Sequence, residues 1–219
     1  MKLAKWLGNS ALVILLSGFL FLGGRETAGY MRLEKETDAL RQEAQADGKS
    51  GETEESSGQS RKRQLDFQTL KAVNPDIRGW IWLPGTGVDY PVLIGRKEGM
   101  YLKRNFKGEA DPLGSVFSYV GTDLSADSRV CLFGHNLISG QMFGSLKKFL
   151  DQTFAEEHRE AFLYTPGGCR EYQFLSAVSC RMEEVFQQKE AHMEKVLSLI
   201  TCGGGEGTVW RTVVNFIEI

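Results

Sequence analysis

The distribution of hydrophobic and polar residues divides the chain into an uncharged N-terminal run, a polar segment and a body of short apolar runs. Residues 6–24 contain no charged side chain, and Lys2 and Lys5 precede them. A helix of this length, at about 1.5 Å per residue, just crosses a hydrocarbon layer of about 30 Å. A cleavable signal peptide is the alternative, but its apolar region is usually about 7–15 residues long, and no A-x-A cleavage site follows. We therefore expect a membrane anchor over residues 1–28.

The charges around this run predict its orientation. Basic residues precede it, whereas the segment after it mixes basic with many acidic residues, so the N-terminus is expected to be cytoplasmic and the rest extracellular. Residues 29–46 show the pattern of a weakly amphipathic helix. Residues 48–60 (GKSGETEESSGQS) offer no apolar surface to bury and predict disorder. Residues 29–64 are interpreted as an extracellular tether behind a single-pass anchor in the cell membrane.

From residue 65 onward the pattern is that of a compact β domain. A helix is predicted over residues 65–73, because apolar residues recur at helical spacing and Asn74-Pro75 ends it. Runs of β-branched and aromatic residues, separated by Gly, Pro and Asp, then predict eight strands at residues 79–84, 89–94, 114–120, 128–133, 161–164, 171–178, 196–202 and 208–219. Residues 140–153 and 182–196 have helical periodicity and predict two helical inserts.

Strands this short and closely spaced leave no room for βαβ units, and a closed barrel removes the exposed sheet edges. We therefore expect residues 65–219 to form a mainly β fold, an eight-stranded barrel with an N-terminal helix and helical inserts. A hydrophobic content of 42% with 25% charged residues is that of an ordinary globular protein with an appended segment. The net charge of −2 gives no support to nucleic-acid binding, which favours a basic surface.

The cysteines and acidic residues predict no metal site and no cofactor. The four cysteines form no C-x-x-C pair, which argues against zinc and thioredoxin-like sites: Cys131, Cys169, Cys180 and Cys202. Cys169 and Cys180 flank one predicted strand; a bridge between them stays open, although a reduced pair is favoured. The spacing of three aspartates matches no calcium-binding loop and indicates turn residues instead: Asp111, Asp123 and Asp127.

The final predicted hairpin contains a candidate nucleophile. Cys202 ends the strand at residues 196–202 and precedes a glycine-rich loop, and Arg211 lies in the next strand. A hairpin brings the guanidinium alongside the sulfur, and a neighbouring cation favours thiolate. A single cysteine in a strand is more often a small buried hydrophobic residue, so the interpretation needs a base.

Of three histidines, His135 is the candidate base. His192 lies in a charged insert and His158 near a predicted helix end, both typical of surface or structural residues. His135 directly follows the strand at residues 128–133, and functional groups often lie at strand ends held by a rigid scaffold. Its imidazole can activate the Cys202 thiol and protonate a leaving amine. Arg211 would stabilise the developing oxyanion, so the three residues together predict acyl transfer.

At this point the chain resembles a known family, the class B sortases. The resemblance rests on Phe133-Gly-His-Asn136, Ser198-Leu-Ile-Thr-Cys202 and Arg211-Thr-Val-Val214, which follow earlier matching segments in the same order and cover about residues 65–219. The resemblance assigns His135, Cys202 and Arg211 as catalytic, and Leu102 and Thr201 as substrate-binding. Three features depart from the family pattern: Ser198 replaces a threonine, Lys97-Glu98 replaces Asp-Asn, and the loop after Cys202 is short and glycine-rich.

The resemblance also implies partners and a reaction. Such enzymes are membrane-anchored cysteine transpeptidases of Gram-positive bacteria. They cleave surface proteins after the threonine of a C-terminal sorting signal, hold them as a thioacyl-enzyme, and pass them to an amine of the peptidoglycan precursor. Three alternatives stay open. One is a pilin-polymerising sortase with a lysine acceptor, and another is a catalytically inactive, membrane-tethered binding module. The third is a papain-like hydrolase, although there the cysteine usually precedes the histidine.

Overall fold

The computed structural model describes residues 27–45, 63–187, 193, 195–203 and 208–219. The chain divides into two compact units, residues 1–40 and 41–219. Residues 27–45 are helical, as expected for this part of the tether. Within the described ranges no helix has both the length and the apolar character needed to cross a membrane. The expected anchor at residues 6–24 and the disordered segment at residues 48–60 lie outside these ranges, so both stay predictions.

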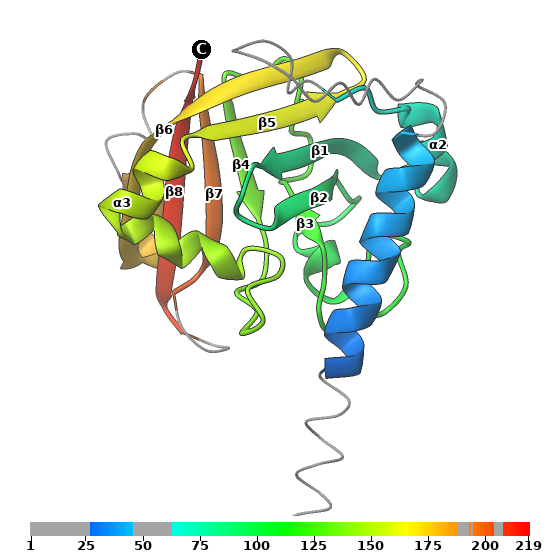
Figure 1. The fold of residues 1–219 in the computed structure, drawn as a ribbon, viewed down its shortest axis with the longest axis horizontal. Coiled ribbons are helices and arrows are strands. Elements are labelled where there is room, and N and C mark those ends of the chain that lie inside the picture. Colours follow the sequence, from blue (N-terminus) through cyan, green and yellow to red (C-terminus); the bar gives the residue numbers. More distant parts are fainter. Residues whose placement is uncertain (1–26, 46–62, 188–192, 194, 204–207) are drawn as a thin grey trace, which may run out of the picture. The chain divides into compact units, whose positions relative to one another are not determined.

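Eight strands close into a barrel in the order β1-β2-β3-β4-β7-β8-β6-β5 (Figure 1). Their bounds are β1 Ile77–Leu83, β2 Val88–Leu93, β3 Val116–Phe117, β4 Arg129–Phe133, β5 Glu160–Thr165, β6 Gly168–Arg181, β7 Val196–Cys202 and β8 Trp210–Glu218. Closure leaves no strand of the barrel with an unpaired edge. The predicted barrel is therefore confirmed.

The barrel contains both antiparallel and parallel pairs. Short turns join β1 to β2 and β5 to β6 as antiparallel neighbours, and β7 pairs with β8 in the same way. By contrast, β2 pairs with β3, and β4 pairs with β7, in parallel. Because parallel neighbours need a crossover connection, the β4–β7 pair joins segments that are far apart in the sequence. This pair carries the candidate site.

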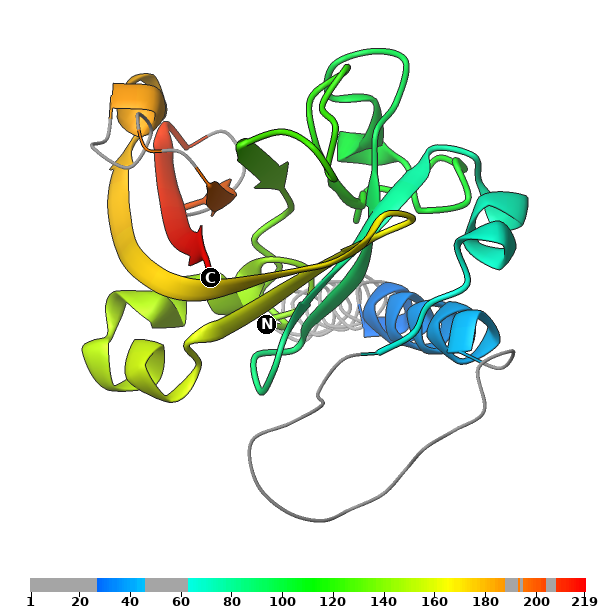
Figure 2. The same ribbon diagram turned by 90° about the horizontal axis from the view of Figure 1, so that it is seen from above.

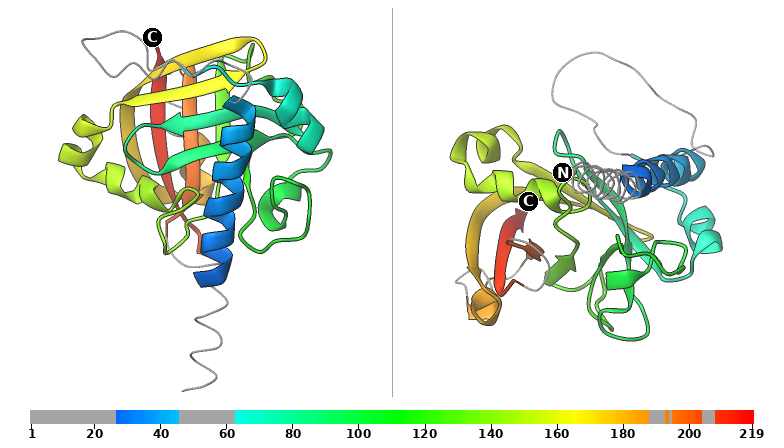
Figure 3. Two further views of the ribbon diagram at one scale, coloured as in Figure 1. Left: turned by 45° about the vertical axis from the view of Figure 1, so that its right-hand side comes forward. Right: turned by 90° about the horizontal axis from the view of Figure 1, so that it is seen from below.

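Two helical segments of the described chain lie between strands β4 and β5. The 3₁₀ helix η2 (Gly144–Leu150) is followed by α3 (Gln152–Glu157), which begins at Asp151 because the Asp151 carboxylate accepts the Phe154 amide. Figure 3 shows η2 and α3 beside the barrel. Phe149 of η2 stacks on Phe174 and meets Phe216 edge to face, which attaches these segments to β6 and β8.

The structure corrects three predicted bounds. Of the insert predicted as a helix over residues 182–196, the structure describes a six-residue 3₁₀ helix at its start, η3 (Met182–Gln187), and Val196 already belongs to β7. Residues 188–192 and 194 lie outside the described residues. The Met182 amide donates to the carbonyl of Val209, the residue before β8. Strand β3 is two residues long instead of seven, because only these two residues pair with β2.

The third correction concerns β6, which runs for 14 residues and pairs with β5 at one end and β8 at the other. A register shift between Phe174 and Ser176 accompanies the strong curvature of this strand in Figure 2. Cys169 and Cys180 lie near its two ends, about 36 Å apart along a strand that rises about 3.3 Å per residue. They do not bridge, and all four cysteines are free thiols.

The predicted helix before the barrel is α2 (Phe67–Val73). The Asp66 carboxylate accepts the Gln68 amide and so caps its N-terminus, and Asn74 ends it in an extended conformation. The Asn74 side chain then donates to the carbonyl of Phe106 and to the hydroxyl of Tyr101. These bonds fasten the segment between β2 and β3 to the end of α2.

Candidate active site

The β7–β8 hairpin places the candidate nucleophile and cation opposite each other. Cys202 pairs with Arg211 across the two strands, and directly paired residues project from the same face of a sheet. Because β8 also pairs with β6, Arg211 faces Cys180 on its other side. The Arg211 Nη1 group donates to the carbonyls of Thr208 (2.6 Å) and Trp210 (2.8 Å). The guanidinium is thus held by its own turn, next to the thiol-bearing strand.

The β4–β7 pair adds the candidate base. Phe133 pairs with Ile200 at the end of β4, and the Gly134 amide continues the ladder by donating to the Ile200 carbonyl at 3.3 Å. His135 follows two residues after this pair, and Cys202 lies two residues after Ile200 on β7. The structure therefore pairs Cys202 with Arg211 and places His135 directly after the strand that neighbours β7.

The His135 imidazole makes its hydrogen bond away from the thiol. Its Nε2 atom lies 2.7 Å from the Leu102 carbonyl oxygen. Among the described residues, no hydrogen bond joins the Cys202 sulfur to His135 or to Arg211. Resting enzymes often show such open arrangements, which tighten once a substrate is bound.

A buried apolar cluster lies between η3 and strands β4, β6, β7 and β8. It consists of four buried residues, Cys180, Val185, Ile200 and Val213, with three partly buried residues packed against them, Cys131, Phe133 and Val178. Tyr119 packs edge to face on Phe133 and lies near Phe186 of η3. The cluster therefore attaches η3 to the strands that lead to Cys202 and Arg211.

Comparison with known proteins gives the family of the chain. The sortase B of Listeria monocytogenes is 34% identical over 170 residues, which cover 76% of this chain and 67% of that protein. The chain belongs to the sortase B family. As a sortase it is a cysteine transpeptidase. No protein-family model matches the chain.

Solved structures support the family fold. The substrate complex of Staphylococcus aureus sortase B superposes with a TM-score of 0.63 at 26% identity, covering 70% of this chain and 84% of that one. The sortase B of Bacillus anthracis reaches a TM-score of 0.69 at 24% identity, covering 88% of this chain and 99% of that one. The latter likeness is one of fold.

Asn136 is a residue of this sortase to which the sequence analysis gave no role. Its Nδ2 donates to the Cys202 carbonyl at 2.8 Å, which joins the residue after His135 to the backbone of Cys202. Asn136 also forms a bridge with Met142, whose amide donates to the Tyr90 hydroxyl. Its position next to His135 in the Gly-His-Asn motif was the available signal.

The two predicted substrate contacts have different surroundings. Leu102 is 44% exposed, and its carbonyl faces the His135 ring. Thr201 is 2% exposed, and its hydroxyl donates to the Gly134 carbonyl at 2.7 Å. Both substrate contacts stay predictions, and for Thr201 the side chain holds the His135 segment against β7.

The remaining described thiols and histidine have structural surroundings. Burial raises the pKa of the Cys131 thiol. Burial, aided by Glu184 and opposed by Arg211, raises that of Cys180, so both favour the unreactive thiol form. The His158 Nδ1 atom bonds the carbonyl of Phe154, on whose ring it stacks, which fits the predicted structural role. His192 lies outside the described residues.

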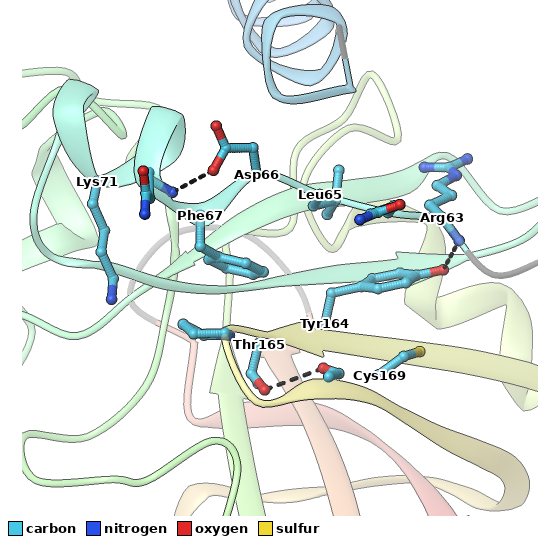
Figure 4. Close-up of a pocket in the computed structure, with 12 residues that line it drawn as sticks. Arg63, Leu65, Asp66, Phe67, Lys71, Tyr164, Thr165 and Cys169 are labelled. Carbon is cyan, nitrogen blue, oxygen red and sulfur yellow. Dashed lines mark hydrogen bonds between the residues drawn. The ribbon is translucent and has the colours of Figure 1, made fainter. Parts of the chain in front are cut away.

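A separate pocket of about 590 Å³ lies between the segment before α2 and the β5–β6 turn (Figure 4). Tyr164 lines it, its hydroxyl accepts the Arg63 amide, and burial raises its pKa to about 12. Cys169 also lines this pocket, at the opposite end of β6 from Cys180, which pairs with Arg211 of β8. The pocket therefore contributes nothing to the arrangement around Cys202.

The predicted turn aspartates are confirmed in that role. The Asp111 carboxylate accepts the Leu113 amide, and the Asp123 carboxylate accepts the amides of Ser125 and Ala126. Asp127 accepts the Asp123 amide and closes the same turn. Each carboxylate is therefore used to hold local backbone.

Proposed function

We propose that this sortase cleaves a C-terminal sorting signal after its threonine, with Cys202 as nucleophile, His135 as acid–base and Arg211 as the group that stabilises the oxyanion. The observation that carries the proposal is the strand pairing: Cys202 pairs with Arg211 across β7 and β8, and His135 follows β4, which pairs with β7. This pairing supports acyl transfer, because that chemistry needs a thiol nucleophile, an imidazole acid–base and a cation from neighbouring segments.

The proposed first step forms a thioester. The Cys202 sulfur, as thiolate, attacks the threonine carbonyl, and the carbonyl oxygen becomes an oxyanion. Within the described residues, the hydrogen bonds of the Arg211 side chain all come from Nη1. The Nε and Nη2 donors of Arg211 are therefore available to that oxyanion. The tetrahedral intermediate collapses as the C–N bond breaks. Protonated His135 gives its proton to the departing amine.

The proposed second step reverses this chemistry with a new amine. The acceptor attacks the thioester carbonyl, His135 takes a proton from the attacking amine, and the C–S bond breaks to release Cys202 thiolate. The solved Staphylococcus aureus sortase B complex contains a substrate, which supports a sorting signal as donor. We assign a peptidoglycan-precursor amine as acceptor and exported surface proteins as donors.

Membrane attachment is part of the proposal. The uncharged run at residues 6–24, preceded by Lys2 and Lys5, supports a single-pass anchor with a cytoplasmic N-terminus. In that arrangement the barrel works outside the cell, where sorting signals and wall precursors meet.

The test uses the full chain in detergent micelles with fluorescent peptides that carry Asn-Pro-x-Thr-Asn, Ser-Pro-x-Thr-Gly or Leu-Pro-x-Thr-Gly. We expect cleavage after threonine, a thioacyl adduct on Cys202 by mass spectrometry, and loss of both in Cys202→Ala. Turnover that survives in Cys202→Ala contradicts the proposed nucleophile. Amine acceptors offered in competition, as a wall-precursor peptide or a pilin lysine peptide, identify the acceptor class.

Thiol labelling separates an enzyme from an inactive binding module. Iodoacetamide is expected to alkylate Cys202 faster than Cys131 and Cys180, whose thiol pKa values are raised by burial. A folded protein whose Cys202 is no more reactive than these two, and that cleaves no peptide, would favour the binding module.

A further inference from the structure

We infer that the backbone carbonyl of Leu102, held in place by Tyr101 and Gly114, fixes the His135 ring with its proton on Nε2. In this arrangement Nδ1 is the atom that exchanges a proton with the reacting groups. The inference rests on the proposed acid–base role of His135. It assigns Tyr101 and Gly114 as positioning residues, since both act through another group.

The hydrogen bond determines which tautomer is present. Nε2 lies 2.7 Å from the Leu102 oxygen, and a carbonyl oxygen can only accept a hydrogen bond. Nε2 therefore carries hydrogen in both the neutral ring and the imidazolium. The proton that the ring gains and loses is the one on Nδ1.

The Leu102 carbonyl is itself held by a buried polar network. Leu102 lies in η1 (Met100–Lys103), next to Tyr101, which is 1% exposed. The Tyr101 hydroxyl donates to the Asp76 carboxylate at 2.8 Å and accepts from Asn74 Nδ2 at 3.0 Å. Since Asn74 ends α2 and Asp76 directly precedes β1, the network ties the acceptor carbonyl to rigid elements.

Gly114 provides the space in which the ring and the carbonyl meet. The backbone φ of Gly114 is +62°, in a region that residues other than glycine rarely adopt. A Cβ atom at this position would lie 2.7 Å from the Leu102 oxygen and 2.9 Å from Cδ2 of His135. It would also lie 2.9 Å from the Tyr101 oxygen. Any side chain here must therefore displace the imidazole or the carbonyl that holds it.

The fold offers a matched control for the backbone strain. Gly87, in the turn between β1 and β2, has a φ of +79°, and a Cβ built there meets no atom within 4 Å. Gly87→Ala and Gly114→Ala thus place alanine in similar left-handed conformations. Only Gly114→Ala crowds the His135 ring, so a difference between the variants reports on positioning.

The test reads the tautomer directly. Full-length protein in detergent, labelled with ¹⁵N-histidine, gives signals from three histidines, and His135→Gln assigns that of His135. We expect Nε2–H in the neutral wild-type ring and in Gly87→Ala. In Gly114→Ala we expect a mixture of tautomers, with kcat reduced at least about tenfold and KM changed by less than about twofold.

A second variant keeps the test decisive. Should Gly114→Ala fail to fold by circular dichroism, Tyr101→Phe replaces it, because this change keeps the ring and removes only the hydroxyl that joins Asn74 to Asp76. A neutral wild-type His135 ring with its single proton on Nδ1 overturns the inference. So does a folded positioning variant that keeps both the wild-type tautomer and the wild-type kcat.

The readouts separate this inference from the proposed function. The tautomer can be measured in a protein that cleaves no peptide, so failure of the wild type in every peptide assay contradicts the proposed function alone. Conversely, an active wild type whose neutral His135 ring carries its proton on Nδ1 contradicts the inference alone.

Discussion

Thr201→Val tests how β7 holds the segment that carries His135. The Thr201 hydroxyl is buried and donates to the Gly134 carbonyl at 2.7 Å, one residue before His135. Valine has nearly the same shape, so the change opens no cavity, but it leaves the partly buried Gly134 carbonyl without its donor. Such a loss costs about 1–3 kcal/mol.

We expect the free energy of unfolding to fall by about 1–2 kcal/mol, measured by urea titration of tryptophan fluorescence. If a comparable loss of about 1.4 kcal/mol reaches the alignment of His135, kcat/KM for the cleaved peptide falls about tenfold. Initial rates on the full chain in detergent give the second quantity, and both are read under one set of conditions.

Thr201→Ser is the matched control. Serine keeps the hydroxyl and loses one methyl group, which costs about 1 kcal/mol of stability but leaves the bond to Gly134 in place. We expect kcat/KM within about twofold of wild type. Equal values of kcat/KM in Thr201→Val and Thr201→Ser would refute the reasoning. An impaired serine variant beside an active valine variant would instead favour a substrate contact through the methyl group.

Two further predictions concern stability. Glu218 accepts hydrogen bonds from Arg170, which lower the Glu218 pKa. Glu218→Gln therefore lowers the free energy of unfolding by about 1–2 kcal/mol near neutral pH. As pH falls below the ordinary glutamate pKa of about 4.3 the difference shrinks, and it disappears below the lowered pKa; a urea titration difference that stays constant to acid pH contradicts this. A Cβ on Gly144 would lie 2.2 Å from the Leu137 carbonyl oxygen, whereas one on Gly140 meets nothing within 4 Å. Gly144→Ala should thus cost about 3 kcal/mol or more and Gly140→Ala about 1–2 kcal/mol, and equal melting temperatures would contradict this.

Local patterns in the sequence were sufficient to predict which strands and helices form, but they predicted the ends of those elements poorly. All eight strands and helix α2 lie where periodicity and turn residues predicted them. Strand β6 extends beyond its predicted range because it pairs with two neighbours, and β3 is short because little of it pairs. The helical pattern after residue 182 predicted the start of η3 but not its length, since the described helix ends at Gln187 and β7 begins at Val196. In each case pairing with distant strands, which local pattern does not record, decided the bounds.

The candidate site likewise combines residues placed by local structure with residues placed by long-range strand pairing. Cys202 and Arg211 were predictable as neighbours because one hairpin, read along the sequence, sets their register. The placement of His135 depends on a parallel pair between β4 and β7, segments that no local signal joins. The residues that orient His135 are harder still, since Gly114 acts through the space it leaves and Thr201 through one buried hydroxyl.

These observations indicate that the position of His135 depends on more separate contacts than the positions of Cys202 and Arg211. The β7–β8 ladder already fixes Cys202 and Arg211, and backbone pairing leaves their relative position little freedom. His135 follows Phe133, the last paired residue of β4, so strand pairing does not fix its position. Hydrogen bonds to neighbouring side chains and carbonyls must do so instead. Thr201 holds the residue before it, Asn136 ties the residue after it to the Cys202 carbonyl, and the Leu102 carbonyl orients its ring. If the proposed roles of His135, Cys202 and Arg211 hold, substitutions elsewhere should therefore reduce turnover mainly where they loosen these three attachments.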